Sequence, residues 1–172
     1  MKLRRNGAEI HYEVYGRGPA IVFAHGLGGN HLSWWQQVAH FAPTHACVVF
    51  AHRGFPPSSA VSGKSAPDSY ADDLAALLQE LNLKEVALVA QSMGGWTCLD
   101  YALRQPERVR SLVMASTSGT LDFGQLGDAE IEEWVRQSPG KLKDLQARGI
   151  HPAGGERMAR EQPALAQLYG QI

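Results

Sequence analysis

The sequence has few cysteines, almost no net charge and no long apolar run. Its two cysteines, Cys47 and Cys98, form no CxxC pair, which excludes a disulfide-rich scaffold and a thiolate metal centre of that spacing. A net charge of −1, from 16 basic and 17 acidic residues spread along the chain, argues against a surface for nucleic acid or anionic lipid. The apolar runs are too short to cross a bilayer, and no apolar segment follows the basic N-terminus as in a signal peptide. These features predict a cytoplasmic protein without nucleic-acid or membrane partners.

Motifs for metal and phosphate binding are also missing. The seven histidines show neither HExxH nor another paired metal-site spacing. The glycine-rich stretch 26–29 has His31 where a dinucleotide fingerprint needs its last glycine. The GKS at 63–65 has Ser58 in place of the first P-loop glycine. We therefore expect no metal, nucleotide or other cofactor.

Residues 1–120 predict an α/β fold. Asn6-Gly7 is a hairpin signal. A continuous apolar run at 20–24, typical of a strand covered on both faces, follows, with further predicted strands at 46–51, 85–90 and 109–116. Helical patterns separate these runs. Their predicted inner faces are Leu32, Trp35, Val38, Ala39 and Ala42; then Tyr70, Leu74, Leu77, Leu78 and Leu81, with Ser69 and Asp72 as a possible cap; then Trp96, Leu99 and Leu103. Strand–helix alternation predicts a mostly parallel sheet with flanking helices.

The chain changes character at about residue 121. Helical patterns at 128–138, 141–149 and 161–170 are broken by proline and glycine, and no strand pattern lies among them. The prediction is a core at 1–120 followed by a helical, cap-like segment at 121–172.

The stretch 86–97, VALVAQSMGGWT, has the spacing of a nucleophile elbow, small-x-Ser-x-small between a strand and a helix. Ala90 and Gly94 are small enough for so tight a turn. The turn holds the Ser92 hydroxyl above the sheet edge at the positive end of the following helix. The N–H of Met93 then points to where an oxyanion forms. Ser92 is the candidate nucleophile; an ordinary exposed serine in a glycine-rich turn is the alternative.

A second glycine-rich stretch, His25-Gly26-Leu27-Gly28-Gly29, ends an earlier strand. It can offer the N–H of Leu27 to the same oxyanion. We expect His25 to brace this loop rather than to act as a base.

Four ordered blocks, VFAHGLGGNHLSWW, VVFAHRGFPPSS, ALVAQSMGGWT and PERVRSLVMAS, resemble the α/β-hydrolase fold family over residues 8–120. The similarity is closest to its small esterase, enol-lactonase and cofactor-free haloperoxidase members. The resemblance implies that Ser92 attacks an ester, lactone or other small acyl substrate and forms an acyl-enzyme, with no metal or organic cofactor. The loop at 51–58 departs from the family's Asp-x-Arg-Gly-x-Gly-x-Ser: Arg53 and Gly54 match, whereas Ala51 and Pro56 do not.

The acid and base that the family places after the nucleophile are harder to find. His151 is the one histidine after Ser92, and Asp122 is the nearest candidate acid. The alternative for His151 is a surface or pocket residue of the cap-like segment, and the alternative for Asp122 is a loop or helix-capping aspartate. Three hypotheses stay open: a hydrolase completed by further sequence or a second chain, a non-catalytic relative that binds ligands or forms oligomers, and an enzyme using His151. Trp34 and Trp96 are candidate substrate contacts or core residues.

Overall fold

The computed structural model describes residues 1–59, 67–120, 127–151 and 154–171. The chain divides into two compact units, Met1–Thr120 and Leu121–Ile172. None of the described helices is long and apolar enough to span a membrane.

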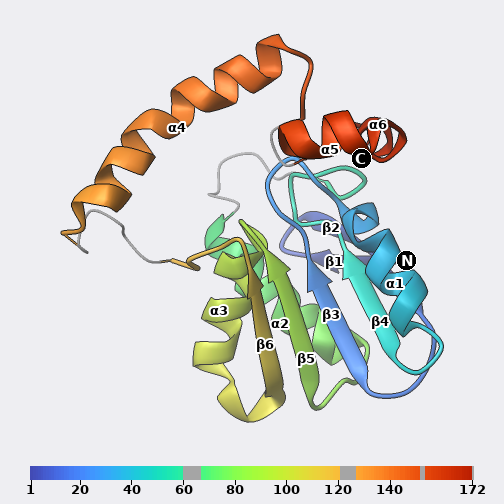
Figure 1. The fold of residues 1–172 in the computed structure, drawn as a ribbon. Coiled ribbons are helices and arrows are strands. Elements are labelled where there is room, and N and C mark those ends of the chain that lie inside the picture. The colour runs from blue at the N-terminus through green and yellow to red at the C-terminus, as the bar shows by residue number, and fades with distance from the viewer. Residues whose placement is uncertain (60–66, 121–126, 152–153, 172) are drawn as a thin grey trace. The chain divides into compact units, whose positions relative to one another are not determined.

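The first unit is built on a six-stranded sheet in the order β1-β2-β4-β3-β5-β6 (Figure 1). The strands are β1 (Lys2–Arg5), β2 (Ala8–Tyr15), β3 (Ala20–Ala24), β4 (Ala46–Phe50), β5 (Val86–Gln91) and β6 (Val109–Ala115). β1, β2 and β4 pair antiparallel, and β4, β3, β5 and β6 pair parallel. The predicted mostly parallel sheet is confirmed. Asn6 and Gly7 both have positive φ in the first hairpin, as its sequence signal required.

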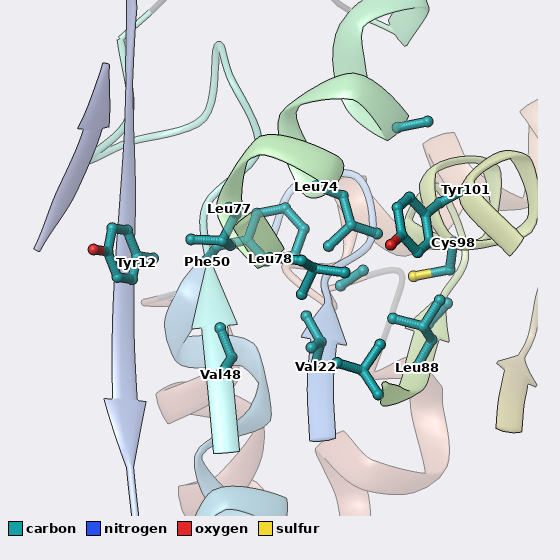
Figure 2. Packing of buried hydrophobic residues seen from close by; sticks show 14 of the residues in the cluster. Tyr12, Val22, Val48, Phe50, Leu74, Leu77, Leu78, Leu88, Cys98 and Tyr101 are labelled. Carbon is teal, nitrogen blue, oxygen red and sulfur yellow. The ribbon is translucent and has the colours of Figure 1, made fainter. Parts of the chain in front are cut away.

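Helices cover both faces of the sheet. The 3₁₀ turn η1 (His31–Trp34) and α1 (Trp35–Phe41) follow β3; η2 (Pro67–Ser69) and α2 (Tyr70–Glu80) precede β5; and α3 (Gly94–Arg104) and η3 (Pro106–Arg108) precede β6. Ile21 and Phe23 of β3 face the α1 side, whereas Val22 faces α2 and α3. This two-sided burial explains why β3 is apolar at every position. Figure 2 shows the larger core, with Leu74, Leu77 and Leu78 of α2 above Val22 and Leu88.

The predicted inner face of α2 is confirmed, but those of α1 and α3 are wrong in part. Leu32 and Trp35 are exposed, and the side chains on the sheet are Trp34, Val38, Phe41 and Ala42. The segment opens with the 3₁₀ turn η1, whose three residues per turn shift the register. In α3, Trp96 and Leu103 are exposed, because the buried stripe runs through Gly94, Thr97, Cys98 and Tyr101.

The expected cap of α2 is also absent. Ser69 has helical backbone angles at the end of η2 and makes no side-chain cap hydrogen bond. The neighbouring Asp72 instead pairs with Arg104, at 3.0 Å. Both cysteines are free and buried, and burial raises the pKa of Cys98 to about 12.

The second unit contains α4 (Ala129–Ala147), α5 (Gly155–Glu161) and α6 (Pro163–Tyr169). Its helical character was predicted, but the expected break at Pro139 is wrong: α4 runs through that residue. Asp128 caps α4 by accepting from the N–H groups of Glu130 and Ile131. Because the helical pattern continues on both sides of Pro139, the proline costs one hydrogen bond without ending the helix.

A buried ion pair ties the loop after β4 to α2. Arg53 donates from Nε and Nη2 to Asp73 at 2.6 and 2.5 Å, and both side chains are 3% exposed. The hydrogen bonds that Arg53 donates to Asp73 raise the pKa of the Arg53 guanidinium. Arg5 Nη1 also lies 4.0 Å from Asp73, whereas Arg53 has Asp73 as its one ion-pair partner among the described residues, so its charge depends on Asp73.

We expect Asp73→Ala to lower the free energy of unfolding by about 3–5 kcal/mol, because it leaves the Arg53 charge buried without a partner. Urea unfolding followed by circular dichroism measures this loss. Asp100→Ala is the matched control: it breaks the exposed Arg104–Asp100 pair and should cost less than about 1 kcal/mol. Equal losses in the two variants would contradict the assigned role of the Arg53–Asp73 pair.

Candidate functional site

The candidate site lies where the parallel strands end. Strands β3, β4, β5 and β6 run in the same direction, so the residues that follow them share one edge of the sheet. Parallel α/β sheets bind ligands at this carboxyl edge. The glycine-rich loop, the loop at 51–59 and Ser92 all begin here.

Ser92 has the backbone conformation of a strained turn. Its φ is +50°, in the left-handed region that serine rarely adopts, and it joins β5 directly to α3. Its N–H donates to the Ala115 carbonyl at 3.1 Å, and its carbonyl accepts from Gly95 N–H at 2.8 Å. The neighbouring strand and the first turn of α3 therefore hold Ser92 in this conformation.

The turn fits because Gly94 has no side chain. A Cβ on Gly94 would lie 2.3 Å from the Ala24 carbonyl oxygen, which is backbone and cannot move aside. A Cβ on Gly95 would lie 2.3 Å from Thr117 Oγ1. The start of α3 is thus pressed against the end of β3 and the chain that follows β6.

The glycine-rich loop lies against the serine. A Cβ on Gly26 would lie 3.0 Å from Ser92 Cβ and 2.2 Å from Gln91 Oε1. The loop closes through a hydrogen bond from Gly29 N–H to the Gly26 carbonyl, with Gly28 at φ +80°. Within the described parts of the chain, the N–H groups of Leu27 and Met93 have no hydrogen-bond acceptor. Met93 directly follows Ser92 in the chain, and Leu27 directly follows Gly26, which lies against Ser92. Backbone N–H groups beside a serine hydroxyl can stabilise an oxyanion.

His25 is used entirely inside the protein. It is fully buried; its Nε2 accepts from His52 N–H at 2.9 Å, so its Nδ1 carries the proton and donates to the Gly26 carbonyl at 2.8 Å. Burial lowers the pKa of His25 to about 4. With both nitrogens engaged, His25 braces the glycine-rich loop and has no nitrogen free for Ser92.

His52 continues this network, and sequence reasoning gave it no role. Its Nε2 lies 2.8 Å from Thr97 Oγ1 on α3, and its ring packs edge-on against His25 at 4.5 Å. Burial, with a smaller contribution from His25, lowers the pKa of His52 well below its usual range. The signal that could have found it is a polar residue directly after the apolar run 46–51.

The loop after β4 is well anchored despite its departures from the family pattern. Ser58 Oγ donates to the Ala51 carbonyl at 2.7 Å and accepts from His11 N–H at 2.8 Å. Gly54, at φ +85°, occupies a turn that favours glycine. Ala51 and Pro56 are thus accommodated without the Asp and Gly of the pattern.

The remaining candidate residues lie in separate parts of the chain. Trp34 packs on Phe23 with ring centroids 5.3 Å apart, and Trp96 is an exposed residue of α3. His151 belongs to the second unit, where its ring lies 5.8 Å from that of Tyr169. Asp122 lies outside the described residues.

Comparison with known proteins places this arrangement in context. The family model described as alpha/beta hydrolase fold matches residues 19–152. The chain is 36% identical to a cis-3-alkyl-4-alkyloxetan-2-one decarboxylase from Shewanella oneidensis, over 67% of this chain and 37% of the relative. It is 30% identical to 3-oxoadipate enol-lactonase 2 from Acinetobacter baylyi, over 72% of this chain and 47% of the relative.

Solved structures show a similar fold. The structure of Est816, described as an N-acyl homoserine lactone degrading enzyme, superposes with a TM-score of 0.76 at 26% identity, covering 99% of this chain and 64% of that one. The chain spans 37–63% of the length of the first curated relatives it matches.

We expect Gly94→Ala to destabilise the protein by about 1–3 kcal/mol, because the added methyl meets the backbone of β3. Chemical unfolding measures the change. Gly140→Ala is the matched control, since Gly140 lies inside α4 with open space around its Cα, and this variant should be neutral or stabilised by up to about 1 kcal/mol. A neutral Gly94→Ala would rule out the close approach described above.

The buried histidines also predict a pH dependence of stability. Below about pH 6.5 the unfolded chain binds protons that folded His25 does not, since its folded pKa is about 4. The buried, neutral His25 therefore makes its full contribution to the free energy of unfolding above pH 6.5. This contribution falls by up to about 3 kcal/mol as the pH drops toward 4. The free energy of unfolding, measured in urea across this range, should change more steeply with pH in the wild type than in His25→Asn. Removal of the exposed His40 by His40→Gln should keep the wild-type slope.

Proposed function

Because the chain belongs to the alpha/beta hydrolase fold family, we propose that it is the nucleophile-bearing part of a serine hydrolase acting on carboxylic esters or lactones. One observation carries the proposal: Ser92 stands at φ +50° between β5 and α3. Its neighbours are the two unpaired N–H groups of Leu27 and Met93 in the described structure. That combination suits attack on a carbonyl carbon and little else.

The proposed reaction begins with attack by the Ser92 hydroxyl oxygen on the substrate carbonyl, while a base takes the hydroxyl proton. The carbonyl oxygen becomes an oxyanion, which accepts hydrogen bonds from Leu27 and Met93 and lies near the positive end of α3. Collapse of this intermediate breaks the ester C–O bond; the departing oxygen takes the proton from the protonated base and becomes a hydroxyl, and an acyl-serine remains. Water then gives a proton to the base and attacks the acyl carbon, and the carboxylic acid is released as the base returns the proton to the Ser92 oxygen.

We propose that the base is supplied from outside the described residues of Met1–Thr120. Both ring nitrogens of His25 are engaged, and His52 is fully buried with its Nε2 on Thr97. The first proposal is a complementing C-terminal segment, which the relatives' greater length supports. The second is His151, with Asp122 as the acid.

Cyclic esters are the substrate class that we favour. The names of the two curated relatives above refer to an alkyl-oxetan-2-one and to an enol-lactone, and the structural neighbour is described as degrading a homoserine lactone. All three compounds contain a lactone carbonyl. We further propose a cytoplasmic location, which the free, buried Cys47 and Cys98 support.

A fluorophosphonate probe followed by mass spectrometry tests the proposal. We expect an adduct on Ser92 that is absent in Ser92→Ala, because the probe reacts with an activated serine hydroxyl. Ser116→Ala is the matched control: Ser116 is an exposed serine with positive φ at the same sheet edge, but no helix begins within residues 117–120 that follow it. This variant should be labelled like the wild type.

The source of the base decides the conditions for labelling. Labelling that requires an added C-terminal fragment of a longer relative, such as the enol-lactonase, supports the complementing segment. Labelling of the chain by itself that is lost in His151→Ala supports His151. An unlabelled Ser92 in both conditions contradicts the serine-hydrolase proposal and favours a relative that binds ligands without catalysis.

A further inference from the structure

Three side chains that can bind a metal gather beside the glycine-rich loop. His11 and Glu13 lie on β2, and His31 is the first residue of η1. One ligand atom from each lies within 4.8 Å of the others. The set combines two imidazoles and one carboxylate.

Strand geometry explains why two of them meet. His11 and Glu13 are two residues apart on β2, so they point from the same face of the sheet. The ring of His31 approaches that face and lies edge-on to the ring of His11, with centroids 4.5 Å apart. The three residues therefore come from two segments that are held together by the fold.

The distances match those between the ligands of a single zinc-like ion. Glu13 Oε1 lies 3.1 Å from His11 Nε2 and 3.7 Å from His31 Nε2. Bonds of about 2.0–2.1 Å to a tetrahedral ion place its ligand atoms roughly 3.3 Å apart. Tyr15 donates a hydrogen bond to Oε2 of Glu13, which orients the carboxylate and leaves Oε1 toward the histidines.

His31 lacks the hydrogen bonds expected of a buried imidazole. Its side chain is only 10% exposed. Its Nδ1 is buried without a partner among the described residues, and its Nε2 is too far from Glu13 for a hydrogen bond. An ion between Nε2 and Oε1 would bridge the 3.7 Å that separates these two atoms, with the imidazole proton on Nδ1.

We propose that His11, Glu13 and His31 bind one divalent cation of the zinc class, with water in the fourth position. Two nitrogens and one carboxylate oxygen form a ligand set that suits such ions. The cation links β2 to η1, which follows the Gly26–Gly29 turn, and so stabilises the loop that carries the Leu27 N–H. The proposal does not depend on the chemistry of Ser92.

Cobalt binding provides the test, with Co²⁺ as a spectroscopic probe and Zn²⁺ as competitor. The untagged 172-residue protein, first stripped of metal with a chelator, should bind one Co²⁺ per chain with visible absorption bands of low coordination number, and Zn²⁺ should displace it. Glu13→Gln and His31→Gln should each weaken binding at least about 100-fold. His40→Gln removes an exposed histidine of α1 and should bind like the wild type.

Thermal unfolding gives an independent readout. Zn²⁺ should raise the unfolding temperature of the wild type and of His40→Gln, but not that of Glu13→Gln, because only a ligand bound to the folded state stabilises it. Circular dichroism identifies any variant that fails to fold; Glu13→Gln keeps the size of the side chain and carries the test if His31→Gln is lost. Absence of stoichiometric Co²⁺ binding by the wild type, or equal affinity in Glu13→Gln, would overturn the proposal.

Discussion

The first turn of α3 packs against the end of β3 with no space for a side chain, and the arrangement of the site depends on this contact. Gly94 faces the Ala24 carbonyl, and Gly26 faces Ser92 itself. These contacts bring the glycine-rich loop and the serine together while the hydrogen bond to Ala115 holds Ser92 at positive φ. The backbone strain is sustained by the strands around it, so the geometry belongs to the sheet and not to a flexible loop.

Two neutral, buried histidines, His25 and His52, support this contact. His25 ties the glycine-rich loop to the chain after β4, and His52 ties that chain to Thr97 on α3. Their burial depresses both pKa values, so the network stays uncharged at neutral pH. Arg53 and Asp73 fix the same loop to α2 by a paired charge. Hydrogen bonds between segments far apart in the sequence thus hold these loops in place, as the close packing at the glycines holds the turn.

Sequence patterns predicted what depends on local chemistry. Apolar runs located β3 through β6, and Ala90 and Gly94 predicted the tight turn at Ser92, because both signals lie within a few residues. The inner faces of α1 and α3 were predicted wrongly in part. The 3₁₀ turn η1 shifts the register of the segment that contains α1, and packing on the sheet decides which face of α3 is buried. The contacts of His52 and Asp73 join residues 20 to 45 positions apart, which no local period encodes.

The difference between local and long-range signals also explains why the proposed nucleophile, Ser92, is easier to assign than its base. An elbow is a local device: one strand, one turn and one helix start are sufficient to raise Ser92 and leave the Met93 N–H unpaired among the described residues. A base must approach from another segment, and its position depends on the packing of that whole segment. His25 illustrates the difference: it begins the glycine-rich loop that lies against Ser92, but its two hydrogen bonds assign it to the scaffold, as expected from the sequence. Proximity to a nucleophile is therefore a weaker guide to catalysis than a nitrogen left free to accept its proton.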